Sequence, residues 1–407
     1  MTWRARTRPY LAARIAVSLA AISVTASPGR AAELPQCRVL DLSPTFATDG
    51  TAFCADSGTT RYAVYRTTDR GRSWTRVGAD SSLWVPDKST VTQIMVSADY
   101  ANDRTVYLAT NSIVYVSTDA GETFAPADML SGDGSGRRLF AAYVDGTSNL
   151  SYLAYAKYES PARLRPPARQ PVDGAAPAKT DRFLLPTRVT AATDPLLLAF
   201  DGRGESLRST VYGCSVDLAC KAARGSFAGL AKGAWRSPSY ATDRSLYFST
   251  ERNGFTFLRS TDGGRTIKPF TSLNAALAPI TAAMKKHDVT QTWPASMAFG
   301  PKGRIYVRVV VVGFSPDAGS PPSQVILRSD DNGARWKTVG TQYHPDDRRR
   351  GTLPFQVTPN TLAENSTFMQ AAPDGRLFAM GDGFGESDIG PWCSVDGGVR
   401  WYRTCPR

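Results

Sequence analysis

Four acidic residues are candidates for catalytic chemistry, because they lie in polar, mostly glycine-containing stretches that we expect to form loops. They are Glu205, Glu251, Glu386 and Asp388. Two carboxyl groups that flank a glycosidic bond can hydrolyse it, one as the acid and the other as the base or nucleophile. Acidic side chains are also common on solvated loops, so a glycosidase hypothesis competes with plain surface placement.

Basic and aromatic residues in similar stretches are candidates for binding. Arg203 and Arg252 are close in sequence to two of the acidic residues, Glu205 and Glu251. Trp84 and Trp293 lie in segments that we expect to connect strands. A tryptophan can form a platform for a sugar or a peptide, although it can equally belong to a core. We predict no metal site and no cofactor, since the chain has only 2 histidines and no Cys-x-x-Cys.

These candidates must be positioned by a repeated local motif. The motif reads Ser/Thr-x-Asp-x-Gly-x-x-(Trp/Phe/Ile), and its aspartates are Asp69, Asp119, Asp262, Asp331 and Asp396. The matching glycines are Gly71, Gly121, Gly264, Gly333 and Gly398. An Asp carboxylate can accept hydrogen bonds from the backbone of its own turn, and glycine permits a positive φ. The motif therefore predicts a structural turn between two strands, which we call a box.

A second repeat precedes three of the boxes. It reads SPTFATDGTAF from Ser43, SADYANDRTVY from Ser97 and SPSYATDRSLY from Ser237, so each copy places an aromatic-Ala-x-Asp turn before a strand. Each unit then consists of four strands with a turn after the first and a box after the third. Repetition of a four-stranded unit is typical of a β-propeller.

The boxes resemble the Asp-box, or BNR, repeats of sialidases, sortilin-type receptors and photosystem II assembly factors. This resemblance covers nearly all of residues 33–407 and implies an all-β fold of four-stranded antiparallel blades. A sialidase would also need an arginine triad, but the early Arg-Ile-Pro motif is missing. The two Arg-Ile pairs are Arg14-Ile15 and Arg304-Ile305, and the latter is followed by Tyr306.

The spacing of the boxes predicts the number of blades. Asp119 and Asp262 are 143 positions apart, which leaves room for two blades that lack a complete box. CSVDLAC is a degenerate box around Asp217, with PTRVTAATD and PLLLAFD as the strands before it. RRLFAAYV and LSYLAYAKY would form the other blade, followed by a Pro/Ala/Arg-rich loop around residues 160–180. We predict seven blades, with six as the alternative.

The two turns of each unit lie at one end of a four-stranded antiparallel sheet. The other end is formed by more irregular loops, including 271–292, 311–324, 341–366 and 381–391. Because binding residues usually lie on variable loops of a rigid scaffold, we expect the functional site at that loop end.

The N-terminus predicts export. A basic front and a short apolar stretch, Ile15–Ala26, are typical of a signal peptide within residues 1–32, with cleavage after Ala26 or Ala32. The apolar stretch is too short to span a bilayer comfortably, so the mature protein would have no transmembrane segment. We expect a secreted or extracytoplasmic monomer.

All 6 cysteines lie in the exported part, and their even number predicts three disulfides. Cys214 with Cys220 and Cys393 with Cys405 would each join neighbouring strands at a box, and Cys37 with Cys54 would do so at the first turn. Pairing Cys37 with Cys405 is an alternative that would close the ring.

Charge and motifs favour a binding function. The net charge of +12 comes from scattered basic residues, a distribution that does not predict nucleic-acid binding but suits an anionic cell-surface polymer. We predict a non-catalytic module that binds a protein or a glycan through the loop end. The alternative is a sialidase-like or other exo-glycosidase.

Overall fold

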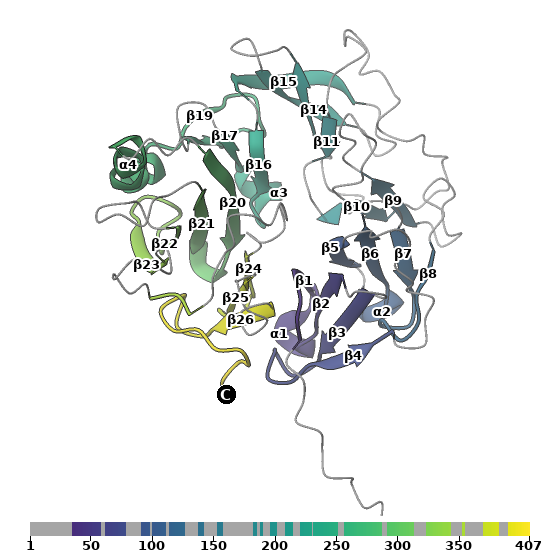
Figure 1. The fold of residues 1–407 in the computed structure, drawn as a ribbon. Coiled ribbons are helices and arrows are strands. Elements are labelled where there is room, and N and C mark those ends of the chain that lie inside the picture. Colours follow the sequence, from purple (N-terminus) through teal and green to yellow (C-terminus); the bar gives the residue numbers. More distant parts are fainter. Residues whose placement is uncertain are drawn as a thin grey trace, which may run out of the picture. The chain divides into compact units, whose positions relative to one another are not determined.

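The protein consists mostly of short β-strands (Figure 1). The computed structural model describes residues 35–57, 62–78, 91–97, 100–110, 114–126, 137–141, 153–157, 182–184, 188–189, 196–201, 208–214, 220–229, 231–250, 256–286, 291–312, 323–342, 352–354, 369–381 and 390–407. Residues 34–407 form one compact unit. The predicted leader, 1–32, and the loop around 160–180 lie outside the described residues.

The described strands form seven sheets, which we number in chain order. Sheet 1 contains β1 (Val39–Leu42), β2 (Ala52–Ser57), β3 (Tyr62–Thr67) and β4 (Thr75–Val77). Sheet 2 contains β5 (Val91–Val96), β6 (Val106–Thr110), β7 (Val114–Ser117) and β8 (Ala125–Pro126). Sheet 3 contains β9 (Arg137–Ala141), β10 (Leu153–Lys157) and β12 (Arg188–Val189).

The remaining sheets follow the same order. Sheet 4 contains β11 (Arg182–Leu184), β13 (Leu196–Asp201), β14 (Arg208–Cys214) and β15 (Cys220–Ala228). Sheet 5 contains β16 (Ala231–Arg236), β17 (Leu246–Thr250), β18 (Thr256–Ser260) and β19 (Lys268–Pro269). Sheet 6 contains β20 (Gln291–Phe299), β21 (Ile305–Val312), β22 (Gln324–Ser329) and β23 (Lys337–Gln342). Sheet 7 contains β24 (Met369–Ala371), β25 (Leu377–Gly381) and β26 (Gly390–Ser394).

Sheet 3 differs from the prediction of purely antiparallel sheets. Its strand β12 pairs in parallel with β10, with Tyr155 opposite Arg188. This segment was predicted to belong to the sheet of Asp217, but the edge strand of that sheet is β11. Both segments are only two or three residues long, and so short a pattern does not specify which neighbour a strand pairs with.

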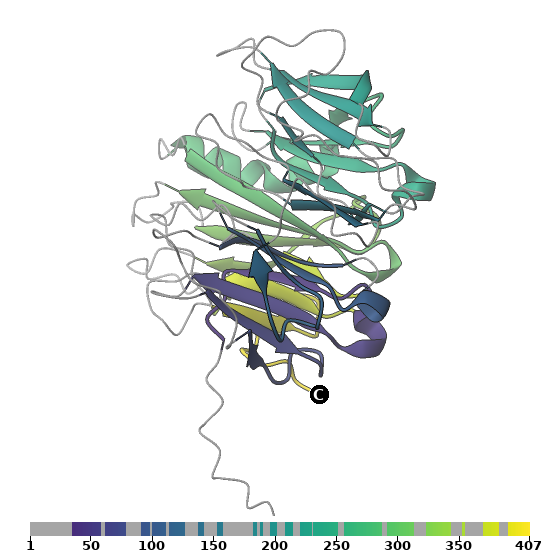
Figure 2. The same ribbon diagram turned by 90° about the vertical axis from the view of Figure 1, so that its right-hand side faces the viewer.

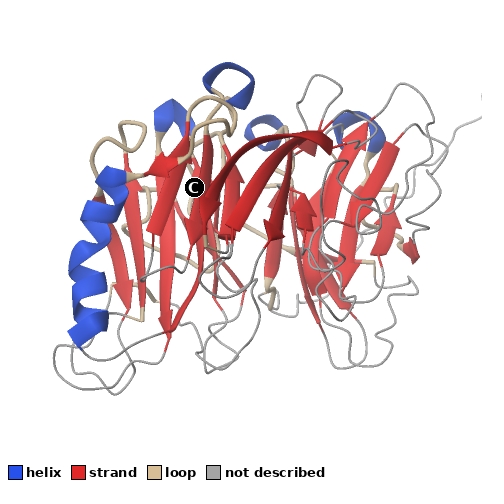
Figure 3. Ribbon diagram, turned by 90° about the horizontal axis from the view of Figure 1, so that it is seen from above, coloured by secondary structure: helices blue, strands red, loops and turns tan. Residues whose placement is uncertain are grey.

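Helix α4 corrects the prediction that residues 271–292 form an irregular loop. Residues Thr271–Lys286 are helical, and β20 begins at Gln291. Leu273, Leu277 and Met284 are buried on one side of the helix, at the spacing of an amphipathic helix. The Asn274 side chain accepts a bond from the Phe257 amide and donates one to its carbonyl, which fixes α4 to β18. Figure 3 shows α4 running along the strands.

Four described clusters of apolar side chains fill the space between sheets that follow one another, and a fifth joins the last sheet to the first. Strand β21 shows the principle, because Ile305 and Val307 pack toward sheet 5 whereas Tyr306 packs toward sheet 7. Between sheets 7 and 1, the Gln370 side chain accepts a bond from the Leu42 amide at 3.2 Å. It also donates one to the Leu40 carbonyl at 2.9 Å.

Two disulfides lie at this contact between sheets 7 and 1. Cys37 is bonded to Cys54, and Cys393 is bonded to Cys405, so the alternative pairing of Cys37 with Cys405 is wrong. Cys214 and Cys220 face each other as register partners on β14 and β15. Within the described part of the chain, no helix is long and apolar enough to cross a bilayer.

Candidate functional site

Most of the residues that the sequence analysis singled out for catalysis or binding lie outside the described residues. These are Glu205, Glu251, Glu386, Asp388, Arg203, Arg252 and Trp84, together with Asp217 of the degenerate box. Trp293 lies on β20, opposite Val310 of β21, so it belongs to a strand and not to a connecting segment as predicted. Among the described residues, recurrent polar side chains lie in the boxes and in the strands that carry them.

The box of sheet 5 shows how these turns are built. The Ser260 hydroxyl donates to Asp262 Oδ1 at 2.7 Å and accepts the Gly264 amide at 2.9 Å. The same carboxylate accepts the Thr266 amide at 2.9 Å. Equivalent bonds occur in the other four boxes, at Asp69, Asp119, Asp331 and Asp396. Each box is thus a turn held by its own side chains.

These bonds keep the box carboxylates ionised. Burial alone would raise the pKa of Asp262, but hydrogen bonds from the Thr266 amide, the Thr266 hydroxyl and Ser260 outweigh it and lower the pKa to about 2. Hydrogen bonds from the Arg335 backbone and side chain lower the pKa of Asp331 to about 2. A general acid at neutral pH needs a raised pKa, so these carboxylates are suited to a structural role.

The boxes and the preceding turns lie at the same end of their sheets. The Arg70 amide donates to the Gly50 carbonyl at 3.0 Å, and the Gly263 amide donates to the Arg244 carbonyl at 2.9 Å. Three of the preceding turns are one-turn helices, visible at the strand ends in Figure 2: α1 (Phe46–Asp49), α2 (Tyr100–Asp103) and α3 (Tyr240–Asp243). We call this end of the sheets the box end.

The carboxylate of Asp103 in α2 also accepts hydrogen bonds from its own turn and so has a structural role. It accepts the Ser97 hydroxyl at 2.5 Å and the Thr105 amide at 2.8 Å. Among the residues that the structure describes, no group of three or more His, Cys, Asp or Glu side chains could hold a metal ion.

Arginines connect one sheet to the box of the next. Arg66 of β3 donates to the Ala120 carbonyl at 2.8 Å, Arg224 of β15 to the Gly263 carbonyl at 3.3 Å, and Arg259 of β18 to the Asn332 carbonyl at 3.4 Å. Arg328 of β22 donates to the carbonyls of Asp396 and Gly397, at 3.2 and 2.8 Å. Because each acceptor is a carbonyl of the box turn itself, every such bond fixes one box against its neighbour.

A second guanidinium joins sheets 6 and 7 away from the boxes. Arg308 of β21 is fully buried, and it donates to Gln324 Oε1 at 2.9 Å and to the Met380 carbonyl at 2.6 Å. Gln324 in turn donates to Gln342 Oε1 at 2.5 Å. This polar layer extends toward the loop end, where β22 begins and β23 ends.

The box of sheet 7 differs from the others in its exposed surface. Among the described residues, the large apolar side chains that are exposed are Val395, Val399 and Tyr402, at 44%, 53% and 37%. The positions equivalent to Val395 hold Thr68, Thr118, Thr261 and Asp330; those equivalent to Val399 hold Arg72, Glu122, Arg265 and Ala334; and those equivalent to Tyr402 hold Thr75, Ala125, Lys268 and Lys337. We call Val395, Val399 and Tyr402 the apolar turn.

Basic side chains border the apolar turn. Asp330 on the neighbouring box is contacted by Arg304 at 2.7 Å, by Lys337 at 3.0 Å and by Arg328 at 3.2 Å. Arg328 also reaches the turn of Asp396, as described above, so this cluster lies beside the apolar turn. Although burial would raise the pKa of Asp330, hydrogen bonds from Lys337 and Arg304 lower it. One carboxylate therefore faces three cations, and Arg400 adds a further exposed cation within the turn.

This surface was not predicted from the sequence, since function was expected at the loop end. The signal was available, since aligning the five boxes shows three valine or tyrosine residues at positions that are mostly polar elsewhere. What the alignment cannot show is that these three side chains are exposed.

No family model and no curated protein matches the chain. Among solved structures, YCF48 from Cyanidioschyzon merolae is 11% identical, with 85% of this chain and 94% of that chain covered and a TM-score of 0.45. A structure described as YCF48 bound to D1 peptide is 13% identical, with 90% and 81% covered and a TM-score of 0.33. The Dos1 propeller is 8% identical, with 90% and 71% covered and a TM-score of 0.29.

Proposed function

We propose that this protein is an exported β-propeller that acts as a non-catalytic binding module, with the apolar turn of sheet 7 as a docking surface for a protein. The observation that carries this proposal is the composition of the last box. It keeps Ser394, Asp396 and Gly398, which hold the turn together, but it exposes apolar side chains where its four counterparts are mostly polar. Exposed apolar groups that do not serve the fold are typical of interaction sites.

The border of the apolar turn supports an acidic partner. The Arg335 side chain is 90% exposed and the Lys337 side chain 55% exposed, and both stand on the box next to the apolar turn. Complementary charge steers association and selects partners, whereas apolar contact supplies affinity. The partner would therefore be a protein segment in which aliphatic or aromatic side chains alternate with carboxylates.

The seven sheets would be the blades of the propeller. Sheets 7 and 1 share a cluster of apolar side chains and the hydrogen bonds of Gln370, as consecutive sheets share theirs. Gly71 of the first box lies against Phe378 of β25 in sheet 7, just as Gly121 of the second box lies against Phe53 of β2 in sheet 1. The same contact at both places supports a ring in which the last sheet adjoins the first.

Export is supported by the two disulfides. Such bonds persist in oxidising compartments outside the cytoplasm and are rare inside it. Together with the predicted signal peptide, they favour a secreted or extracytoplasmic protein.

The loop end remains a predicted second surface. Arg203, Arg252, Trp84 and Trp293 would belong to it, and a glycosidase would use the acidic residues of the same stretches. Hydrolysis of chromogenic glycosides by the purified protein, lost in Glu386→Gln or Glu205→Gln, would replace the binding proposal with that alternative.

The docking surface can be tested with three short fluorescent peptides: one acidic and aliphatic, one acidic with serine in place of the aliphatic residues, and one basic and aliphatic. Fluorescence anisotropy would compare the wild type with the triple variant Val395→Thr, Val399→Arg, Tyr402→Thr, which installs the residues of the first box. We expect the acidic aliphatic peptide to bind best, and its affinity to fall about tenfold or more in the variant, which corresponds to about 1.4 kcal/mol.

The variant separates apolar contact from charge, because Val399→Arg adds a cation. If binding were purely electrostatic, as for an anionic polymer, affinity would rise in the variant and the proposal would be wrong. The matched control adds Thr68→Val, Arg72→Val and Thr75→Tyr to the triple variant. The apolar side chains then lie on the first box and are absent from the last box. Dimerisation of the wild type that the triple variant abolishes would identify a second copy as the occupant and would also overturn the proposal.

A further inference from the structure

The contact between sheets 7 and 1 lacks a feature that fixes the boxes elsewhere. In three of the other four boxes an arginine precedes the box Ser or Thr, namely Arg66, Arg259 and Arg328, and each donates to a carbonyl of the following box. In the last box this position is Cys393. These two sheets also lie at opposite ends of the chain, so no connecting segment joins them directly.

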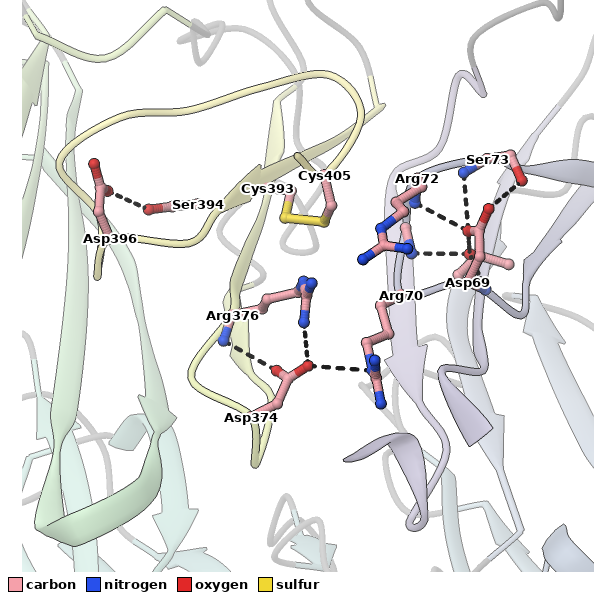
Figure 4. Close-up of a disulfide and its surroundings, with 12 residues drawn as sticks. Asp69, Arg70, Arg72, Ser73, Asp374, Arg376, Cys393, Ser394, Asp396 and Cys405 are labelled. Atoms are coloured by element: carbon pink, nitrogen blue, oxygen red, sulfur yellow. Dashed lines mark hydrogen bonds and ion pairs between the residues drawn. A yellow bond between two sulfur atoms is a disulfide. The ribbon is translucent and has the colours of Figure 1, made fainter. Parts of the chain in front are cut away.

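The C-terminal segment replaces the missing arginine. The Cys405 amide donates to the Gly71 carbonyl of the first box at 2.9 Å. A Cβ at Gly71 would come within 2.9 Å of the Cys405 sulfur, so the two residues are in close contact. Cys405 is held in this place by its bond to Cys393, beside Asp374, Arg376 and Arg70 (Figure 4).

The N-terminal segment makes the reciprocal crossing. Its Pro35 carbonyl accepts a bond from Arg403 Nη2 at 3.3 Å and packs closely on Gly390 of β26. Two residues later, Cys37 is bonded to Cys54 of β2. Each end of the described chain is thus tied to its own sheet by a disulfide and to the opposite sheet by hydrogen bonds.

We propose that the Cys393–Cys405 disulfide is a redox-sensitive clasp across the contact between sheets 7 and 1, because it holds Cys405 of sheet 7 against Gly71 of sheet 1. An external dithiol would open it. One thiolate attacks a sulfur of the Cys393–Cys405 bond and releases the other cysteine, and the second thiol then attacks the mixed disulfide and releases the remaining cysteine. The dithiol is oxidised to its disulfide, while Cys393 and Cys405 take up two electrons and two protons as thiols. Cys405 is then no longer covalently held against Gly71.

Opening the clasp would loosen the contact without dissolving it. The bonds of Gln370 and the ion pair between Arg70 and Asp374, at 3.6 Å, do not depend on the disulfide. Cys393 and Cys405 are only 2% and 4% exposed, so a dithiol reaches them after local opening of the segment. The clasp therefore affects the local stability of this one contact. The inference does not rest on the proposed binding function.

Hydrogen–deuterium exchange of the full chain, followed by mass spectrometry, tests the clasp in the variant Cys393→Ser/Cys405→Ser. The matched control is Cys214→Ser/Cys220→Ser, which removes a cysteine pair from sheet 4. We expect exchange to accelerate about tenfold or more, equivalent to about 1.4 kcal/mol, in residues 401–407 and in the first box. Exchange in the box of sheet 6 would stay unchanged, and the control would change neither region.

Two results would overturn the clasp: unchanged exchange in residues 401–407, or equal acceleration in all sheets, which would make the bond a general staple. If the variant does not fold, the wild type can be treated with dithiothreitol, alkylated and subjected to the same exchange measurement. Selective loss of protection in residues 401–407 on reduction of Cys393–Cys405 supports the clasp, and retained protection contradicts it.

Discussion

The box aspartates show how one residue type serves the fold at five places. Asp262 accepts hydrogen bonds from a following amide and from the hydroxyl of Ser260, and the same hydroxyl holds the Gly264 amide. Because a buried or half-buried amide without a partner is costly, the serine, aspartate and glycine of a box depend on one another. Their repetition therefore reflects stability of the turns.

Acid should weaken this arrangement at Asp262. Its pKa in the folded protein is lowered from the ordinary 3.8 to about 2, so its contribution is present above the ordinary value and is lost as the pH falls through this range. Asp262→Asn should destabilise the protein by about 1 kcal/mol at neutral pH, and its loss of stability below pH 3.8 should be shallower. Urea midpoints across the acid range check this, with the exposed Glu122→Gln as control. An unchanged acid slope in the Asp262 variant would contradict the prediction.

The box glycine has a second role in packing. Gly333 has a φ of +87°, and a Cβ there would collide with the Phe270 ring, whereas Gly375 has a φ of +93° with nothing within 4 Å. An alanine at either place bears the cost of a positive φ, about 1–2 kcal/mol, but only at position 333 must the neighbouring sheet also shift. Gly333→Ala should therefore lower the free energy of unfolding more than Gly375→Ala. Equal losses in chemical denaturation would remove the packing role.

At the scale of elements, we expect the arginines that join neighbouring sheets to contribute more to stability than exposed ion pairs do. Arg328 bonds two carbonyls of the next box, whereas Arg335, in the same box region, pairs only with the exposed turn carboxylate of Asp331 among the contacts described here. We predict that Arg328→Met lowers the free energy of unfolding by about 1–2 kcal/mol and Arg335→Met by less than about 0.5 kcal/mol. Thermal and urea unfolding of both variants measure the difference. Similar values for the two would refute the role of Arg328.

Helices and strands could be predicted from the sequence only where their residues follow a clear pattern. Strands β17, β18 and β22 combine strand-forming residues with a box or turn, and the sequence identifies each of them. Helix α4 was missed because residues 271–292 were predicted as an irregular loop, although its apolar residues at 273, 277 and 284 recur at helical spacing. The pairing of β12 could not be predicted, since two residues do not determine a neighbour.

At the scale of the whole molecule, the candidate site was only partly visible in the sequence. The apolar turn is evident when the boxes are aligned, but its exposure and its position beside Arg328 depend on how sheets 6 and 7 pack. By contrast, the disulfides Cys37–Cys54 and Cys393–Cys405 each lie within one sheet, and the sequence predicted both pairings. Local patterns fix turns, whereas contacts between distant segments follow from the packing of complete sheets.

The central claim is that sheets 7 and 1 adjoin as consecutive sheets do, and a circular permutant tests it most directly. Arg403 reaches the Pro35 carbonyl at 3.3 Å, so a short glycine–serine linker can join Arg407 to Leu34, with new ends at Gln291 and Lys286. We predict that this permutant unfolds cooperatively, with a urea midpoint close to that of the uncut chain. The control is the uncut chain with the same linker inserted between Lys286 and Gln291. If this control unfolds cooperatively and the permutant does not, the claim is contradicted.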